Sequence, residues 1–217
     1  MIKLIKVFVV DDQNLIRTGI KKLLGDVPGI KVVGEAADGE TAIKSLKELE
    51  PDVVLMDIKM PGMNGLEATK KILRTHSDLK IIALTICDDD LFPSRLLQAG
   101  AYGYLTKGAS VPEMVKAIRS VHAGQRYISP EIASQLALKH ITDRGETPFD
   151  LLSERELQVA LMIVNGHKVQ EISDKLCLSP KTVNSYRYRI FEKLNIKSDV
   201  ELTHLAYRHN ILEQVRE

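Results

Sequence analysis

The sequence predicts an α/β domain with a doubly wound, five-stranded parallel sheet, followed by an all-α domain of four short helices. From residue 1 to about residue 123, short apolar runs alternate with segments whose apolar residues recur every three or four positions. This alternation is typical of parallel strands covered by helices on both faces. Residues 151–217 carry only helical patterns. The polar segment 124–150, with one short helix predicted at Pro130–Lys139, is interpreted as a linker.

Five apolar runs supply the predicted strands, with helical segments such as Leu15–Leu24 between them. The runs are Ile5–Val10, Lys31–Ala36, Val53–Met56, Ile81–Ile86 and Gly103–Leu105.

The four helices of the second half have recognisable ends. Ser153 and Glu156 have the spacing of a capping box, and Gly166 ends that helix. Ser179-Pro180 begins another helix with proline at its first position, and Ser198 is the predicted cap of the last one.

The composition is that of an ordinary water-soluble chain. Its 217 residues are 44% hydrophobic and 27% charged, with a net charge of +1. The apolar run at the N-terminus is too short for a signal peptide, and no apolar stretch approaches the length of a bilayer span. Cys87 and Cys177 follow no metal-binding spacing, which indicates reduced thiols. We therefore expect a cytoplasmic protein without a membrane partner.

Acidic residues follow two of the predicted strands at the point where each strand ends. Asp11 and Asp12 follow the first run, and Asp57 follows the third. Because ligands of parallel sheets bind beyond the carboxyl ends of the strands, these carboxylates are expected to converge at one edge. Three such charges repel one another unless a cation lies among them. Their oxygens suit Mg2+ or a similar ion such as Mn2+.

Two further strand ends complete a set of residues suited to phosphoryl transfer. Thr85 ends the fourth run with a hydroxyl, and Lys107 follows the fifth with a positive charge. A metal ion and a lysine neutralise phosphoryl oxygens while one carboxylate attacks. Asp57 is the predicted nucleophile because it stands alone, and the main-chain carbonyl of Lys59 is a predicted metal ligand.

The turn after Asp57 contains Pro61, Gly62 and Gly65 and is expected to leave room for a phosphate. Each acid taken singly has a plainer explanation, since an acid after a strand commonly caps a turn. Another alternative is a Mg2+-dependent phosphohydrolase that forms an aspartyl phosphate. Such an enzyme needs an acid two residues after the nucleophile, where this chain has Lys59, and this disfavours the enzyme.

The tracts VFVVDDQNLIRTGI, DVVLMDIKMPGMNGLEATKKI, IIALTICDDD and GAYGYLTKGAS resemble the receiver domain of two-component response regulators, a CheY/flavodoxin-like fold. The resemblance covers residues 1–123 and implies that Asp57 accepts a phosphoryl group from a sensor histidine kinase. It also implies that Asp11 and Asp12 hold Mg2+ with Asp57 and the carbonyl of Lys59.

The same resemblance implies roles at the other strand ends. Lys107 would pair with the phosphoryl oxygens, and Thr85 and Tyr104 would form a switch pair. Position 86, often small in receivers, is isoleucine here, and Ile86 is expected to narrow access to the phosphoryl group.

In the second half, HKVQEISDKLCLSPKTVNSYRYRIFEKLNI fits the pattern of a helix-turn-helix. An apolar arc of its second helix is expected to be buried, namely Val183, Tyr186, Ile190 and Leu194. The residues expected at DNA are Lys181, Thr182, Asn184, Ser185, Arg187, Tyr188, Arg189 and Lys193. Between Ser179 and Lys197 five cations oppose one acid, a local charge of +4. The alternative is a solvated helix with ordinary charges.

Residues 151 to about 212 resemble the LuxR-type helix-turn-helix of the NarL/FixJ class. The tract KTVNSYRYRIFEKL is similar to the GacA/UvrY/LetA subgroup, with Asn184 and Tyr186 where many members of the class carry Lys and His. The class implies a transcription factor that dimerises when phosphorylated. Its implied partners are promoter DNA and RNA polymerase. The subgroup implies a BarA-like hybrid kinase and small regulatory RNA genes that titrate a CsrA-type repressor.

The resemblance implies no enzyme activity beyond phosphoryl transfer and autodephosphorylation at Asp57. A receiver that acts through protein contact alone, with the helical half as an interaction module, is the remaining alternative.

Overall fold

The computed structural model describes residues 4–85, 92–141, 147–209 and 211. The chain separates into two compact units, Met1–Leu138 and Lys139–Glu217. The division falls inside helix α6 (Pro130–Ile141), which matches the short helix predicted in the linker. The domain boundaries at residues 123 and 150 remain predictions.

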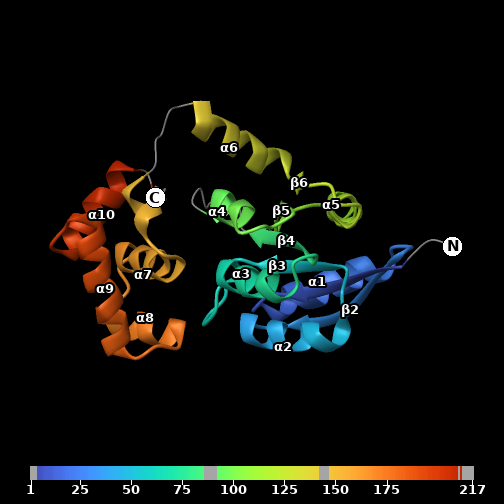
Figure 1. Cartoon of the computed structure of the whole chain (residues 1–217), viewed down its shortest axis with the longest axis horizontal. Helices are drawn as coiled ribbons and strands as arrows, with labels where there is room; N and C mark the ends of the chain where they lie inside the picture. The colour runs from blue at the N-terminus through green and yellow to red at the C-terminus, as the bar shows by residue number, and fades with distance from the viewer. Residues whose placement is uncertain (1–3, 86–91, 142–146, 210, 212–217) are drawn as a thin grey trace. The chain divides into compact units, whose positions relative to one another are not determined.

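The first unit is built on a parallel sheet of six strands in the order β2-β1-β3-β4-β5-β6 (Figure 1). The strands are β1 (Ile5–Val10), β2 (Ile30–Ala36), β3 (Val53–Asp57), β4 (Lys80–Thr85), β5 (Gly103–Thr106) and β6 (Tyr127–Ile128). The prediction of five strands was therefore one strand short. β6 lies in the segment interpreted as a linker and pairs with Gly103 and Tyr104 of β5. Two residues are too few for a periodic pattern, so only this pairing reveals the strand.

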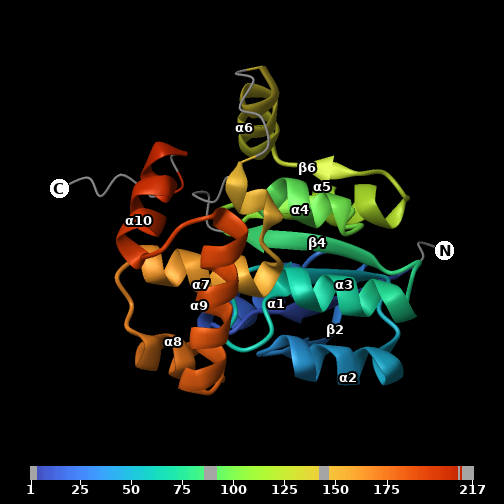
Figure 2. The same ribbon diagram turned by 60° about the vertical axis from the view of Figure 1, so that its left-hand side comes forward.

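Helices cover both faces of this sheet, as the alternating pattern predicted (Figure 2). Alternate residues of β1 point to opposite faces. Val7 and Val9 pack in one core with buried residues of α1 (Asn14–Gly25) and α5 (Val111–His122). Phe8 and Val10 pack in the other core with α2 (Gly39–Leu49) and α3 (Gly65–Thr75). Helix α4 (Phe92–Gln98) precedes β5 in the chain.

The second unit is helical throughout its described residues. A 3-10 turn, η1 (Pro148–Leu151), leads into four helices, α7 (Glu154–Val164), α8 (Val169–Leu176), α9 (Pro180–Leu194) and α10 (Asp199–Arg208). The predicted caps are confirmed, because Ser153, Ser179 and Ser198 each accept a hydrogen bond from a main-chain N–H of the first turn. Helix α9 packs against α7 and α8. No helix among the described residues is long and apolar enough to cross a membrane.

Candidate functional site

Three carboxylates meet at the carboxyl edge of the sheet, as the sequence predicted. Asp11 directly follows β1 and Asp57 is the last residue of β3, and these two strands are paired neighbours. Asp12 comes next in the chain and is exposed, whereas Asp11 and Asp57 are buried. One carboxylate oxygen from each of the three lies within 4.8 Å of the others. The packing of two adjacent strands is therefore what assembles the acidic cluster.

Lys107, the residue that follows the carboxyl end of β5, also lies in this cluster. Its Nζ lies 2.8 Å from Oδ2 of Asp11 and 2.8 Å from Oδ2 of Asp57. Its main-chain N–H donates to the carbonyl of Thr85, which ties the residue to the end of β4. Burial acts to lower the pKa of Lys107, but the hydrogen bonds to the two carboxylates outweigh it and raise the pKa. The ammonium therefore stays charged.

One lysine does not compensate the cluster fully. Burial raises the pKa of Asp57 from 3.8 to about 6, against the opposing hydrogen bond and positive charge of Lys107. The main-chain N–H of Lys59 donates to Oδ1 of Asp57 at 3.2 Å, which also favours the ionised form. Three acids with hard oxygen donors and one bridging lysine leave negative charge for a divalent cation, so the residues present fit Mg2+.

The predicted switch residues lie on the neighbouring strands β4 and β5. Thr85 is 3% exposed at the carboxyl end of β4, and Tyr104 is fully buried on β5. Tyr104 also pairs with β6, and its carbonyl accepts the main-chain N–H of Ser129. The role of the pair as a switch remains a prediction. Ile86, expected to narrow access to the site, lies outside the described residues, as does Cys87.

Of the two glycines expected in the turn after Asp57, Gly62 lies in the turn and Gly65 lies in helix α3. Gly62 lies in a turn with φ +70°, as a glycine-dependent turn requires. Gly65, in contrast, is the first residue of α3, and a Cβ there would lie 2.0 Å from the main-chain oxygen of Asp57. Gly65 is therefore needed for the close approach of α3 to the strand that carries Asp57. The sequence alone showed only that Gly65 lies near a turn, and it gave no sign of this close approach.

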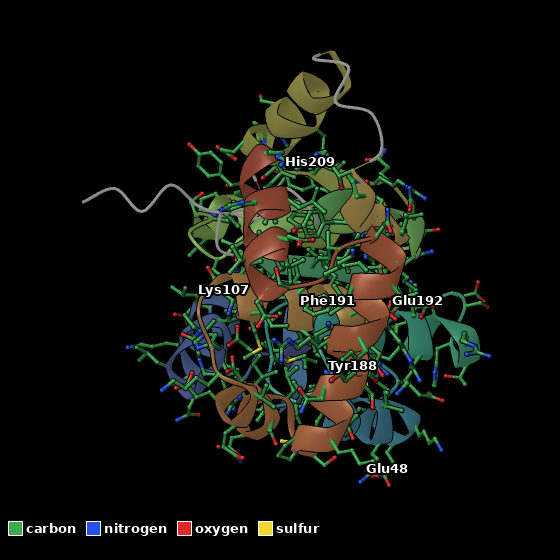
Figure 3. All side chains as sticks on the ribbon, turned by 90° about the vertical axis from the view of Figure 1, so that its left-hand side faces the viewer. Glu48, Lys107, Tyr188, Phe191, Glu192 and His209 are labelled. Carbon is green, nitrogen blue, oxygen red and sulfur yellow. The ribbon has the colours of Figure 1, made fainter. Side chains whose placement is uncertain are left out.

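Helix α9 presents much of the predicted DNA-binding set to solvent. Lys181, Ser185, Tyr188 and Arg189 are exposed, and Thr182 and Asn184 are half-buried. Figure 3 shows Tyr188 and Glu192 along this helix. On the other side of α9, Val183, Ile190 and Leu194 are buried as predicted, and Tyr186 is half-buried rather than buried.

Two cations of the predicted DNA-binding set are paired with acids of the same unit. Arg187 donates from Nε to Oδ1 of Asp199 at 2.7 Å and from Nη2 to the other carboxylate oxygen. Lys193 Nζ lies 2.6 Å from Oε2 of Glu156. These pairs give both residues a part in holding the helices together, and their contact with DNA remains a prediction.

Comparison with known proteins places both units in described families. The response regulator receiver domain matches residues 7–119, and the luxR family of bacterial regulatory proteins matches residues 150–206. Response regulator GacA of Pseudomonas syringae pv. syringae (strain B728a) is 65% identical over 211 residues, covering 97% of this chain and 99% of that protein. Response regulator UvrY of Escherichia coli (strain K12) is 58% identical over 209 residues, covering 96% of each.

Among solved structures, RcsB from Salmonella enterica serovar Typhimurium, bound to promoter P1flhDC in the presence of the phosphomimetic BeF3-, is similar with 27% identity and a TM-score of 0.66. The match covers 93% of this chain and 97% of that one. Because the receiver and luxR family models match residues 7–119 and 150–206 and the relatives are 58–65% identical over nearly their whole length, the chain belongs to the response regulators, as a transcription factor with a receiver domain and a LuxR-type DNA-binding domain.

Proposed function

We propose that this chain stores a signal as an aspartyl phosphate on Asp57 and converts it into sequence-specific DNA binding by α9. The single observation that carries the proposal is Lys107, whose ammonium lies 2.8 Å from both Asp11 and Asp57 at the carboxyl edge of the sheet. The proposed division is a receiver at residues 1–123, a linker at 124–150 and a DNA-binding domain at 151–217.

In the phosphoryl transfer, a carboxylate oxygen of Asp57 attacks the phosphorus of a phosphohistidine on the sensor kinase. The P–O bond to Asp57 forms as the P–N bond breaks, and the imidazole nitrogen keeps the electron pair and takes a proton from solvent. Lys107 supplies a fixed positive charge next to the oxygens of the group being transferred. Asp57 reacts in its ionised form, although burial raises its pKa to about 6 when no cation is bound.

Asp11, Asp12 and Asp57, with the carbonyl of Lys59, are the residues that would hold Mg2+ or Mn2+. When bound, this ion neutralises charge on the transferring oxygens. The close approach of the three carboxylates supports a divalent cation here. The chain needs no other catalytic group for this step, and we propose no enzyme activity beyond transfer to Asp57 and the later hydrolysis.

The phosphoryl group is proposed to act on the switch pair, with Thr85 moving toward it and Tyr104 following. Phosphorylation adds charge and acceptor oxygens next to the Thr85 hydroxyl, which biases a two-state surface near the last strands. The pairing of Tyr104 with β6 supports this route, because α6 begins at Pro130, two residues after that strand. A change at Tyr104 would therefore reach the linker through the main chain.

The helical unit is proposed to read DNA as a dimer. The proposed contacts of α9 with base edges and phosphates are Lys181, Thr182, Asn184, Ser185, Arg187, Tyr188, Arg189 and Lys193, of which Lys181, Ser185, Tyr188, Arg189 and Lys193 are exposed and Arg187 is half-buried beside Asp199. One small helix-turn-helix makes too few contacts for tight specific binding, and a second copy on the other half-site solves this. Likeness to RcsB, whose structure holds promoter DNA, supports the proposal.

The proposed partners are a BarA-like hybrid kinase, as the resemblance of the helix-turn-helix tract to the GacA/UvrY/LetA subgroup implies, and RNA polymerase, both met in the cytoplasm. The proposed targets are promoters of small regulatory RNA genes.

The proposal is tested by incubating the full chain and Asp57→Asn with acetyl phosphate and Mg2+, followed by separation of phosphorylated protein. Wild type should be labelled and Asp57→Asn should not. The labelled protein is then used to select bound sequences from random DNA. Labelling of Asp57→Asn would refute the nucleophile. Labelling without enrichment of any DNA sequence would instead favour a receiver that acts by protein contact.

A further inference from the structure

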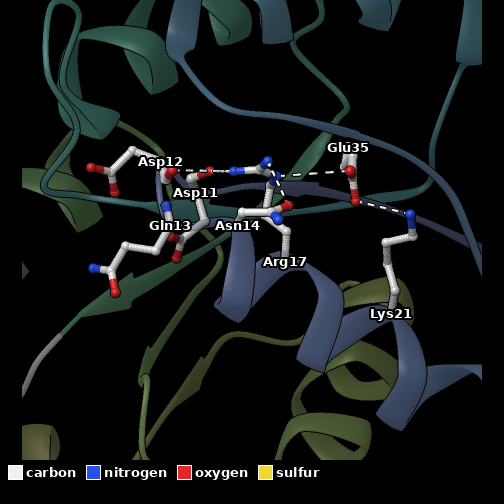
Figure 4. A network of polar contacts seen from close by, with 7 residues as sticks. All are labelled: Asp11, Asp12, Gln13, Asn14, Arg17, Lys21 and Glu35. Carbon is white, nitrogen blue, oxygen red and sulfur yellow. Dashed lines mark hydrogen bonds and ion pairs between the residues drawn. The ribbon is translucent and has the colours of Figure 1, made fainter.

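Arg17 of α1 points back toward the loop that carries the acidic pair (Figure 4). Its Nη1 donates to the main-chain carbonyl of Asp11 at 2.7 Å and to that of Asp12 at 3.2 Å, and its Nη2 donates to Oδ1 of Asn14. The side chain is only 12% exposed. An ordinary surface arginine on a helix would extend into water instead of binding two consecutive carbonyls.

A chain of charges holds Arg17 in this position. Its Nε lies 3.9 Å from Oε1 of Glu35, a residue of β2, and the other oxygen of Glu35 lies 3.0 Å from Nζ of Lys21 (Figure 4). Lys21 lies one turn after Arg17 on α1. Glu35 therefore places a negative charge beside the guanidinium, without a hydrogen bond to Nε, from a strand that supplies none of the predicted metal ligands.

The carbonyls of Asp11 and Asp12 lie just beyond the end of β1, where hydrogen bonding to the neighbouring strand ends. The N–H of Asp11 still donates to Ala36 of β2, but beyond it the chain leaves the sheet for α1. The carbonyls of Asp11 and Asp12 belong to the two peptide planes on either side of Asp12. By binding both carbonyls, Arg17 fixes the orientation of these planes. These planes set the direction of both carboxylates, and Asp11 must reach Lys107 with Oδ2 while Oδ1, which also accepts the main-chain N–H of Gln13 at 2.9 Å, keeps a lone pair for a cation.

We infer that Arg17 is a positioning residue that sets the geometry of Asp11 and Asp12 as metal ligands. Its planar guanidinium can bind several acceptors in a fixed arrangement, which a lysine ammonium cannot reproduce. Groups that orient metal ligands in this way typically contribute about ten-fold or more to metal affinity. The inference rests on the proposed function, because it requires that the acidic pair binds a divalent cation.

The test compares the full chain with Arg17→Lys and, as a matched control, Arg74→Lys, which makes the same change at an exposed arginine in the last turn of α3. Binding of Mn2+ alone is followed by the loss of the free-ion signal in electron paramagnetic resonance. Arg17→Lys should raise the half-saturating Mn2+ concentration about ten-fold, and Arg74→Lys should leave it unchanged. Equal half-saturation in wild type and Arg17→Lys overturns the inference and leaves the proposed function standing.

Two further measurements separate positioning from a general loss of structure. In labelling by acetyl phosphate, Arg17→Lys should raise the half-saturating Mg2+ concentration while the rate at saturating Mg2+ stays within about two-fold of wild type. If Arg17→Lys fails to fold, Glu35→Gln keeps the arginine and weakens only its anchor, so it should give a smaller rise. An unchanged Glu35→Gln would then overturn the inference. If wild type binds no Mn2+, the metal site itself is refuted, and the positioning role falls with it.

Discussion

Lys193 Nζ, near the end of α9, lies 2.6 Å from Oε2 of Glu156, the third residue of α7. The same oxygen accepts the main-chain N–H of Ser153 at 2.8 Å, so one carboxylate both caps α7 and binds α9. Burial acts to raise the pKa of Glu156, but its hydrogen bonds to Lys193 and Ser153 outweigh it and lower the pKa. This lysine, predicted from the sequence to contact DNA, is thus also a link between helices.

Replacing Lys193 with Met should destabilise the helical unit. The change leaves a buried carboxylate with one charge-assisted hydrogen bond fewer, a cost of about 1–2 kcal/mol because Lys193 itself is partly exposed. Because the folded pKa of Glu156 is lowered, the stabilisation is present above its unfolded pKa and is lost as the pH falls through the folded value. The difference between wild type and Lys193→Met should therefore shrink in acid.

Native-state hydrogen exchange followed by mass spectrometry measures this cost, since it reports the amides of α7 and α9 separately from the receiver. Lys181→Met is the matched control, because it removes an exposed lysine from the same helix. Equal protection in Lys193→Met and Lys181→Met would show that the link adds nothing to stability.

The two halves differ in how far the sequence could predict them. The convergence of Asp11 and Asp57 was predictable, because a mostly apolar run precedes each acid and fixes its strand, and parallel strands end at a common edge. The partners of Arg187 and Lys193 were not, because Asp199 and Glu156 lie 12 and 37 residues away in the chain. Only the packing of helices brings such pairs together.

Asp57→Asn should stabilise the chain at neutral pH. Burial holds the folded pKa of Asp57 at about 6, above the ordinary value of 3.8, so ionising the group costs the folded state about 3 kcal/mol. The folded state binds the proton more tightly, so this cost grows as the pH rises from about 4 to about 6 and is constant above that. Asparagine removes this cost, which already includes the attraction of Lys107, so the net gain should be about 2–3 kcal/mol.

Thermal unfolding of wild type and Asp57→Asn at pH 5 and at pH 7.5, without divalent cations, measures this difference. The advantage of the variant should be larger at pH 7.5. A variant that is less stable than wild type at both pH values would show that the pair with Lys107 outweighs the burial of Asp57.

Gly65→Ala should disturb Asp57 without touching its side chain. A methyl group at position 65 would lie 2.0 Å from the main-chain oxygen of Asp57, so either α3 or the end of β3 must move. We expect a loss of about 3 kcal/mol in unfolding free energy and slower labelling by acetyl phosphate. Gly19→Ala is the control, because a Cβ at that position of α1 has no contact within 4 Å and should stabilise the helix by about 0.5–1 kcal/mol. Normal labelling of Gly65→Ala would show that the site tolerates the shift.

Asn184 and Arg189 should contribute to DNA binding in different ways. Asn184 is half-buried on α9 and suits bidentate contact with adenine, whereas Arg189 is exposed and suits a phosphate. Asn184→Ala should cost about 1–3 kcal/mol on a selected site and little on random DNA. Arg189→Ala should weaken binding to the selected site and to random DNA equally. It should also reduce the slope of log affinity against log salt concentration by about one. Titrations of the phosphorylated chain at several salt concentrations distinguish these effects, and an equal loss on both DNAs for Asn184→Ala would reassign that residue to the backbone.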